Sequence, residues 1–111
     1  MPHDGFYLVL VTCESRAQAE KMSNVLIEKR LAGCVSMVDN VSSIYRWEGK
    51  IEKSKEVLLL IKTHKSHFKE LEMVVKENHS YANPEIVGIS FDNASSEYLE
   101  WLKKEVECRN P

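Results

Sequence analysis

Cysteine, glycine and proline are all scarce in this chain of 111 residues, which contains 3 Cys, 4 Gly and 3 Pro. Cys13, Cys34 and Cys108 form an odd set without a CxxC spacing, which is typical of reduced thiols in a cytosol rather than of a disulfide framework. No positively charged and then apolar segment opens the N-terminus, so we expect no secretory signal. The sequence therefore predicts a cytoplasmic protein.

Long runs of one charge sign and long apolar runs are also missing. The 15 Lys and Arg residues nearly balance the 17 Asp and Glu residues, for a net charge of -2, so nucleic acid is not an expected partner. The longest apolar stretches, residues 6–11 and 57–61, are far shorter than the roughly 20 residues of a membrane helix, so we expect no membrane contact. The length predicts one domain, residues 1–111, around a single core.

No arrangement typical of an enzyme is visible. The sequence offers no Ser-His-Asp or Cys-His pattern, and Arg16 follows Glu14 by two residues without the glycine-rich cradle that a phosphatase needs. Residues 6–13 and 56–63 also lack the paired aromatic residues with basic neighbours that are typical of RNA-binding sheets. We therefore expect a protein that is not an enzyme and has no obligatory cofactor.

The remaining pattern predicts four strands and three helices. Ser15 and Gln18 form a capping box at a helix start, and Gly33 is the expected left-handed end of that helix. The two-residue loop Glu48-Gly49 joins two long strand-like runs into a hairpin. We expect strands at residues 6–13, 34–47, 50–63 and 85–91, and helices at about 16–32, from 66, and from 95 or 96, the last with Trp101 facing inward.

This order predicts an α+β fold, a ferredoxin-like βαββαβ plait with an added C-terminal helix and both crossover helices on one face of the sheet. Such a sheet should alternate apolar and polar residues, yet residues 8–11 and 57–61 are continuously apolar. The last helix is too short to cover a whole sheet, so copies of the same chain are the simplest cover for the second face. The alternative is a two-layer monomer with some exposed apolar surface.

Four stretches together resemble the CutA family of divalent-cation tolerance proteins: "EKRLAGCVSMV", "SSIYRWEGKIEKSKEVLLLIKT", "HSYANPEIVGI" and "YLEWL". The resemblance runs from about Leu8 to Leu102, nearly the whole chain. It implies a ferredoxin-like fold assembled as a compact homotrimer through the long hairpins, similar in architecture to the PII nitrogen-signalling proteins. This implication agrees with the apolar second face.

The resemblance also bears on a metal site. Some bacterial members of the family bind copper through a strand-one Cys and two adjacent His residues, and here Val11 and Asn78 stand at two of these positions while His79 remains. An imidazole in a polar loop can bind copper or zinc, Glu85 could add a carboxylate oxygen, and a second subunit could bring Glu56 to the same cleft. Helix capping or packing is the alternative role of His79.

A pocket between subunits is the second predicted site, made of Lys62, Glu56, Tyr45, Trp47 and Tyr81. Lys62 ends an apolar strand, so we expect its ammonium group at a subunit junction or paired with Glu56 or with the glutamate at position 85. Such a lysine would either bind an anionic small molecule or form an interface salt bridge. Tyr45 and Trp47 are expected to serve in cross-strand packing or as interface anchors.

The sequence thus predicts a non-enzymatic, homotrimeric, CutA-like divalent-cation tolerance protein. We expect it to bind copper or another divalent metal in clefts between subunits and to take part in the response to metal ions. The alternative is a PII-like signalling or adaptor trimer that binds a small anionic ligand or a protein partner.

Overall fold

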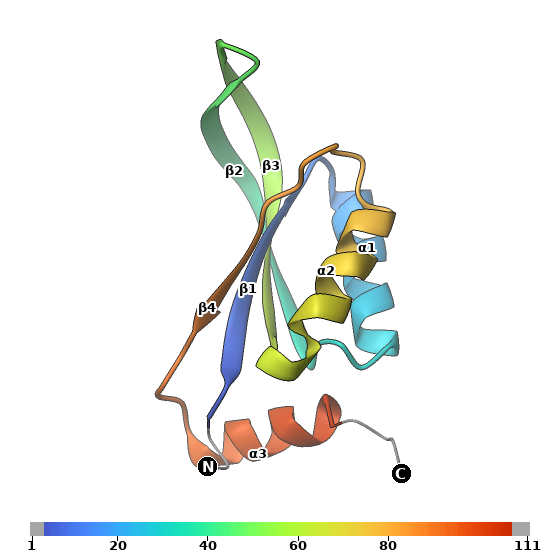
Figure 1. Ribbon diagram of the computed structural model, residues 1–111, viewed down its shortest axis with the longest axis vertical. Coiled ribbons are helices and arrows are strands. Elements are labelled where there is room, and N and C mark those ends of the chain that lie inside the picture. The colour runs from blue at the N-terminus through green and yellow to red at the C-terminus, as the bar shows by residue number, and fades with distance from the viewer. Residues whose placement is uncertain (1–3, 108–111) are drawn as a thin grey trace.

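A computed structural model describes residues 4–107, which form one four-stranded antiparallel sheet with helices on one face and at one end (Figure 1). The strand order is β2-β3-β1-β4, which places β2 and β4 at the two edges. This topology confirms the predicted ferredoxin-like βαββαβ plait with an added helix. The elements are β1 (Phe6–Cys13), α1 (Arg16–Glu28), β2 (Cys34–Trp47), β3 (Lys50–His64), the 3-10 turn η1 (Lys65–His67), α2 (Phe68–Asn78), β4 (Ile86–Ser90) and α3 (Ser96–Glu105).

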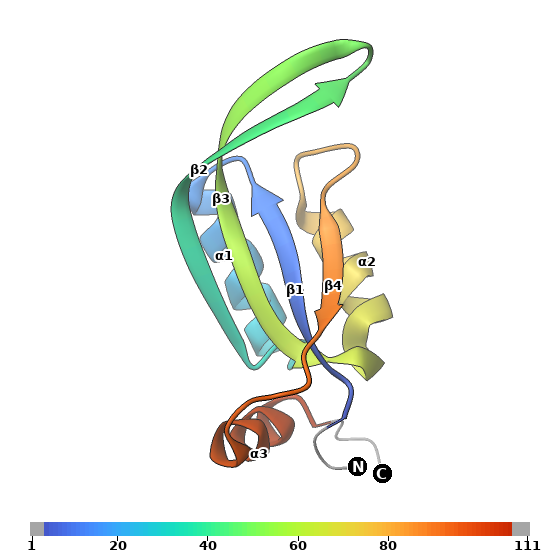
Figure 2. The same cartoon turned by 90° about the vertical axis from the view of Figure 1, so that its left-hand side faces the viewer.

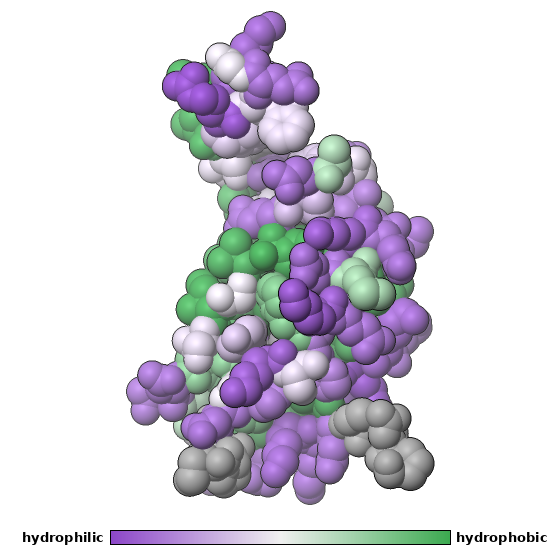
Figure 3. Space-filling view, in the orientation of Figure 1, coloured by the Kyte–Doolittle hydropathy of each residue, from purple (hydrophilic) through white to green (hydrophobic). Residues whose placement is uncertain are grey.

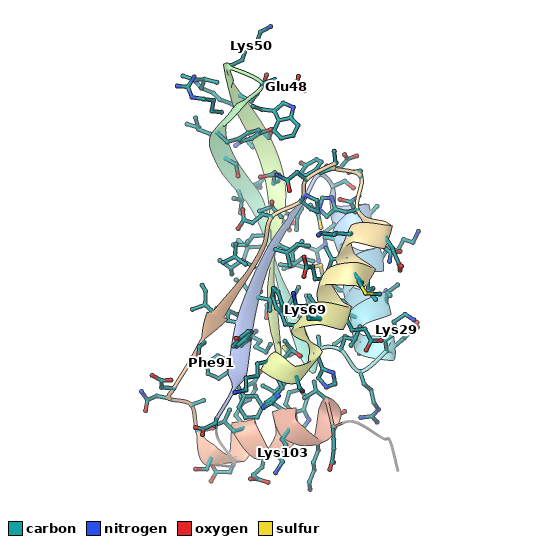
Figure 4. All side chains as sticks on the ribbon, in the orientation of Figure 1. Lys29, Glu48, Lys50, Lys69, Phe91 and Lys103 are labelled. Atoms are coloured by element: carbon teal, nitrogen blue, oxygen red, sulfur yellow. The ribbon has the colours of Figure 1, made fainter. Side chains whose placement is uncertain are left out.

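The β2–β3 hairpin extends well beyond the rest of the sheet (Figure 2). Its loop residues Glu48 and Gly49 have φ of 51° and 81°, the two positive values that a tight type I′ turn requires. Pairing of β1 with β3 ends at Cys13 and Val57, so the part of β3 before Val57 has β2 as its strand partner. The hairpin end is therefore a two-stranded ribbon, with Glu48 and Lys50 at its tip (Figure 4).

The core lies between the sheet and the two helices α1 and α2. Because successive strand residues point to opposite faces, every second residue of β1 and β3 faces these helices. Apolar residues of α1 and α2 meet them at helical spacing, and all of these side chains are buried. The set includes Val9, Val11, Leu59 and Ile61 from the strands and Met22, Leu26, Leu71 and Val75 from the helices.

Helix α1 ends earlier than its sequence pattern predicts, and the residue that ends it is Arg30 rather than Gly33. Arg30 takes φ 59°, and the N–H groups of Arg30 and Leu31 donate to the carbonyls of Ile27 and Leu26, both at 3.0 Å, which is the Schellman pattern of helix termination. The glycine has a different role. A Cβ at Gly33 would lie 2.4 Å from Cδ1 of Leu102, so α3 packs directly against its backbone.

Helix α3 covers the end of the sheet and leaves its second face open (Figures 1 and 2). Its side chains Leu99 and Leu102 pack with Phe6 and Val106 in a second apolar cluster. Trp101 was expected to face inward, but this prediction is wrong, because its side chain is 43% exposed. Leu99 takes the inward position instead, as the helical spacing from Leu102 allows.

The face of the sheet opposite α1 and α2 is apolar, as its sequence predicts. Figure 3 shows hydrophobic residues gathered on this side of the strands. Val38, Val87 and Ile89 are 43%, 46% and 45% exposed, and the neighbouring leucines are half-buried. We call this set the open face: Leu8, Leu10, Val38, Leu58, Leu60, Val87 and Ile89.

Candidate functional site

A hollow of about 740 Å³ lies at the base of the extended hairpin. Its lining residues come from the end of β1, the outer halves of β2 and β3, and the loop that leads from α2 into β4. Figure 2 shows where these segments lie in the fold. Five residues predicted for a site line it together, namely Tyr45, Trp47, Glu56, Tyr81 and Glu85. Residues from two separate sequence predictions therefore line the same hollow, although His79 and Lys62 are not among them.

The hairpin turn fixes which side chains face the hollow. With Glu48 and Gly49 in the loop, Tyr45 pairs with Glu52, and alternate residues of both strands share a face. The Tyr45 hydroxyl lies 2.7 Å from Oγ of Ser54, two residues further along β3. Glu52, which also lines the hollow, was not predicted from the sequence, although counting outward from the two-residue loop would have placed it opposite Tyr45.

Glu56 is the most deeply buried acidic group of the hollow, with 6% of the residue exposed. Its Oε2 accepts a hydrogen bond of 2.9 Å from the Tyr81 hydroxyl. Burial, followed by this hydrogen bond and the Glu56 charge, raises the pKa of Tyr81 well above its usual value, so the hydroxyl stays a donor at neutral pH. Burial and the charge of Glu56 also raise the pKa of the neighbouring Cys13 thiol to about 11, which keeps it neutral.

His79 supports the loop from behind Tyr81. Its Nε2 lies 2.7 Å from the Thr12 carbonyl oxygen and donates to it, while its Nδ1 accepts from the Tyr81 N–H at 3.0 Å. The two rings are 4.8 Å apart, centre to centre. Both ring nitrogens thus have backbone partners in this conformation, so a metal could bind His79 only in exchange for one of these hydrogen bonds.

The described part of the chain does not hold a complete metal site by itself. Among residues 4–107, no three His, Cys, Asp or Glu side chains are grouped so that they could hold a metal ion. Glu85 lines the hollow, whereas His79 lies outside its lining. The two predicted donors thus stand at either end of the loop between α2 and β4, and a metal held by them would need further ligands.

Lys62 is separated from the other predicted pocket residues. It lies near the opposite end of β3, paired in register with Cys34 and Leu8, and its Nζ donates to Oγ of Ser36 at 2.9 Å. No ion pair within residues 4–107 includes Lys62. The predicted pairing with a glutamate is thus not made within residues 4–107, and Lys62 lies six positions after Glu56 along β3.

The comparison with known proteins decides the family. The family described as CutA1 divalent ion tolerance protein matches residues 7–105. The chain belongs to the CutA1 family. The divalent-cation tolerance protein CutA of Thermus thermophilus is 41% identical over 97 residues, which cover 87% of this chain and 94% of that protein. The crystal structure of CutA1 from Oryza sativa superposes with a TM-score of 0.92 at 34% identity, covering 96% of this chain and 98% of that one.

Membership in the CutA1 family confirms the resemblance stated above and the fold that it implies. A chloroplastic CutA protein of Arabidopsis thaliana is 40% identical over 96 residues, which make up 86% of this chain and 53% of that protein. The chain thus spans about half the length of this CutA relative, and the name of the relative places it in the chloroplast. Within residues 4–107, no helix has the length and apolar character needed to cross a membrane.

Proposed function

We propose that this CutA1 chain is a non-enzymatic homotrimer that takes part in the response to divalent metal ions. The open face is the observation that carries the proposal. Three of its side chains, Val38, Val87 and Ile89, each expose over two-fifths of their surface although they lie on one continuous apolar sheet face. Monomeric proteins rarely leave such a face in water, and closed assemblies of identical chains are the usual cover.

The extended hairpin supports the same assembly. Ile44 and Ile51 are among the most exposed large apolar residues, and they lie on the two-stranded ribbon beyond β1. A two-stranded ribbon is marginally stable in water by itself, so we infer that it packs on neighbouring subunits. Both edges of the sheet, β2 and β4, are also available for contacts between subunits.

We further propose that copper or another divalent metal binds in the clefts between these subunits. His79 and Glu85 are the donors that we assign to one chain, because they flank the same loop next to the hollow. Imidazole nitrogen and carboxylate oxygen suit copper and zinc. The second subunit must complete the ligand set, since the described part of one chain groups no three donors.

Sedimentation equilibrium and copper titration test the two parts separately. The proposal requires a particle of three times the chain mass of 12.8 kDa. In calorimetry with Cu²⁺, His79→Ala should lower the affinity without changing the oligomeric state, whereas His64→Ala, which removes a half-buried histidine far from the hollow, should leave the affinity unchanged. Equal copper binding by the parent chain and His79→Ala would contradict the metal assignment.

A PII-like adaptor that binds a small anionic ligand or a protein partner is the second candidate. The observation in its favour is Lys62, whose half-buried ammonium group contacts Ser36 and Cys34 and takes part in no ion pair within residues 4–107. Citrate binding that is lost in Lys62→Gln would support this function.

We also place the protein in the cytoplasm, since Cys13 and Cys34 are free cysteines.

A further inference from the structure

The hollow at the base of the hairpin combines carboxylates with aromatic rings. Glu52, Glu56 and Glu85 line it, and none of its lining residues is a lysine, arginine or histidine. We propose that this hollow is a binding site for an organic ammonium cation, of the polyamine class. The proposal names a ligand other than a metal ion, and it does not depend on the metal-binding function proposed above.

The three carboxylates of the hollow are not ion-paired inside the described chain. None of the ion pairs within residues 4–107 includes Glu52, Glu56 or Glu85. Lys53 and Lys55, which alternate with Glu52 and Glu56 along β3, face the opposite side of the ribbon. Lys50 shares the face of Glu52 beside the turn, but it does not line the hollow and makes no ion pair within residues 4–107. A cation that enters the hollow therefore meets three carboxylates without competition from a basic residue of its lining.

Glu56 gives the strongest reason to expect a cation. The residue is 6% exposed, and the hydrogen bond to its carboxylate comes from the neutral Tyr81 hydroxyl. A buried carboxylate is costly unless it is paired with a positive charge or well hydrogen-bonded. No basic residue lines the hollow beside Glu56, so an ammonium group bound there would supply the positive partner of this carboxylate.

Aromatic rings determine the kind of cation. Tyr45 and Trp47 leave over two-fifths of their surface exposed, and with Tyr81 they add three rings to the walls. The faces of such rings attract alkylammonium groups, while the ring surface packs against the carbon chain between charges. The volume of about 740 Å³ is also that of a small-molecule site rather than of a single ion.

Two other ligand classes fit the same walls less well. A bare divalent ion needs converging donors, and within residues 4–107 no three acidic, His or Cys side chains are grouped closely enough to hold one. An anion would be repelled by three carboxylates, and Lys62, the residue expected to attract it, is bonded to Ser36 at the other end of β3. An extended cation with several charges satisfies separated carboxylates and rings together.

Calorimetry with spermidine tests the site, using the full chain in its native assembly at low salt. We expect Glu52→Gln and Trp47→Leu each to weaken spermidine binding at least tenfold. The matched control is Glu100→Gln, which removes the same charge from the exposed surface of α3, and it should bind as the parent does. In a Trp101→Phe background, the fluorescence of Trp47 should change as spermidine binds.

The proposal is overturned if spermidine produces neither heat nor a change in Trp47 fluorescence. It is equally overturned if Glu100→Gln weakens binding as much as Glu52→Gln does, since the attraction would then be general surface charge. Displacement of spermidine by equimolar Mg²⁺, or tighter binding of citrate, would refute the ligand class. Sedimentation of the same samples keeps the questions separate, because a monomer that binds spermidine contradicts the trimer alone.

Discussion

Val87→Lys should dissociate the assembly, because Val87 lies on the open face at the β4 edge and is 46% exposed. Burying a whole valine side chain is worth about 1.5–3 kcal/mol, so covering the exposed half contributes roughly 1 kcal/mol per chain. The three chains of a trimer would together lose roughly 3 kcal/mol of association free energy, which corresponds to a factor of about a hundred in the dissociation constant. An ammonium group buried without a partner adds to this loss.

Sedimentation velocity over a dilution series provides the measurement. The matched control is Ile27→Lys, because Ile27 is 41% exposed but lies on α1, behind the opposite face of the sheet. The parent chain and Ile27→Lys should sediment as trimers at micromolar concentration, whereas Val87→Lys should show monomer. A parent chain that stays monomeric throughout, or a Val87→Lys protein that stays trimeric, would refute the reasoning from the open face.

Two further substitutions test the packing around the site and at the sheet end. Gly33→Ala places a Cβ 2.4 Å from Cδ1 of Leu102, so urea denaturation should show a loss of about 1–3 kcal/mol, and unchanged stability would disprove the tight contact. Tyr81→Phe removes the donor to buried Glu56 and should cost about 1–3 kcal/mol at neutral pH. Because burial raises the pKa of Tyr81 above its usual 10.0, folding favours the protonated hydroxyl. The parent should therefore lose thermal stability as the pH rises above 10. An equal alkaline loss of stability in Tyr81→Phe would show that Tyr81 is not its cause.

The sequence predicted the fold correctly where a local motif allows only one backbone conformation. The loop Glu48-Gly49 needs two positive φ values and fixes the register of the hairpin, and the capping side chain of Ser15 sets the start of α1. Prediction failed where tertiary packing decided. Gly33 looks like a helix terminator, but α1 stops at Arg30 because the Schellman hydrogen bonds form there, and the glycine is instead required by the approach of α3.

The candidate site shows the same division. Tyr45, Trp47 and Glu56 line one hollow within the chain because strand alternation places them on a common face of the hairpin, while the predicted pocket between subunits stays a prediction. Within one chain Lys62 lies apart from these three residues, near the other end of β3, because a pocket predicted between subunits sets no distance along a single strand. Whether Lys62 meets a glutamate of another subunit stays a prediction.

The length of the hairpin links the two surfaces on which both proposals depend. β1 ends at Cys13, opposite Val57, so the residues of β3 that precede Val57 lose one strand neighbour, and the loop before β4 lies beside them instead. That loop contributes Tyr81 and Glu85, and its contact with Glu56 closes the hollow. Where β1 does run alongside β3, the same face is apolar and open. A shorter hairpin would keep the open face but lose both the hollow and the exposed ribbon residues Ile44 and Ile51, so the hairpin end contributes to the proposed assembly and to the proposed cation site.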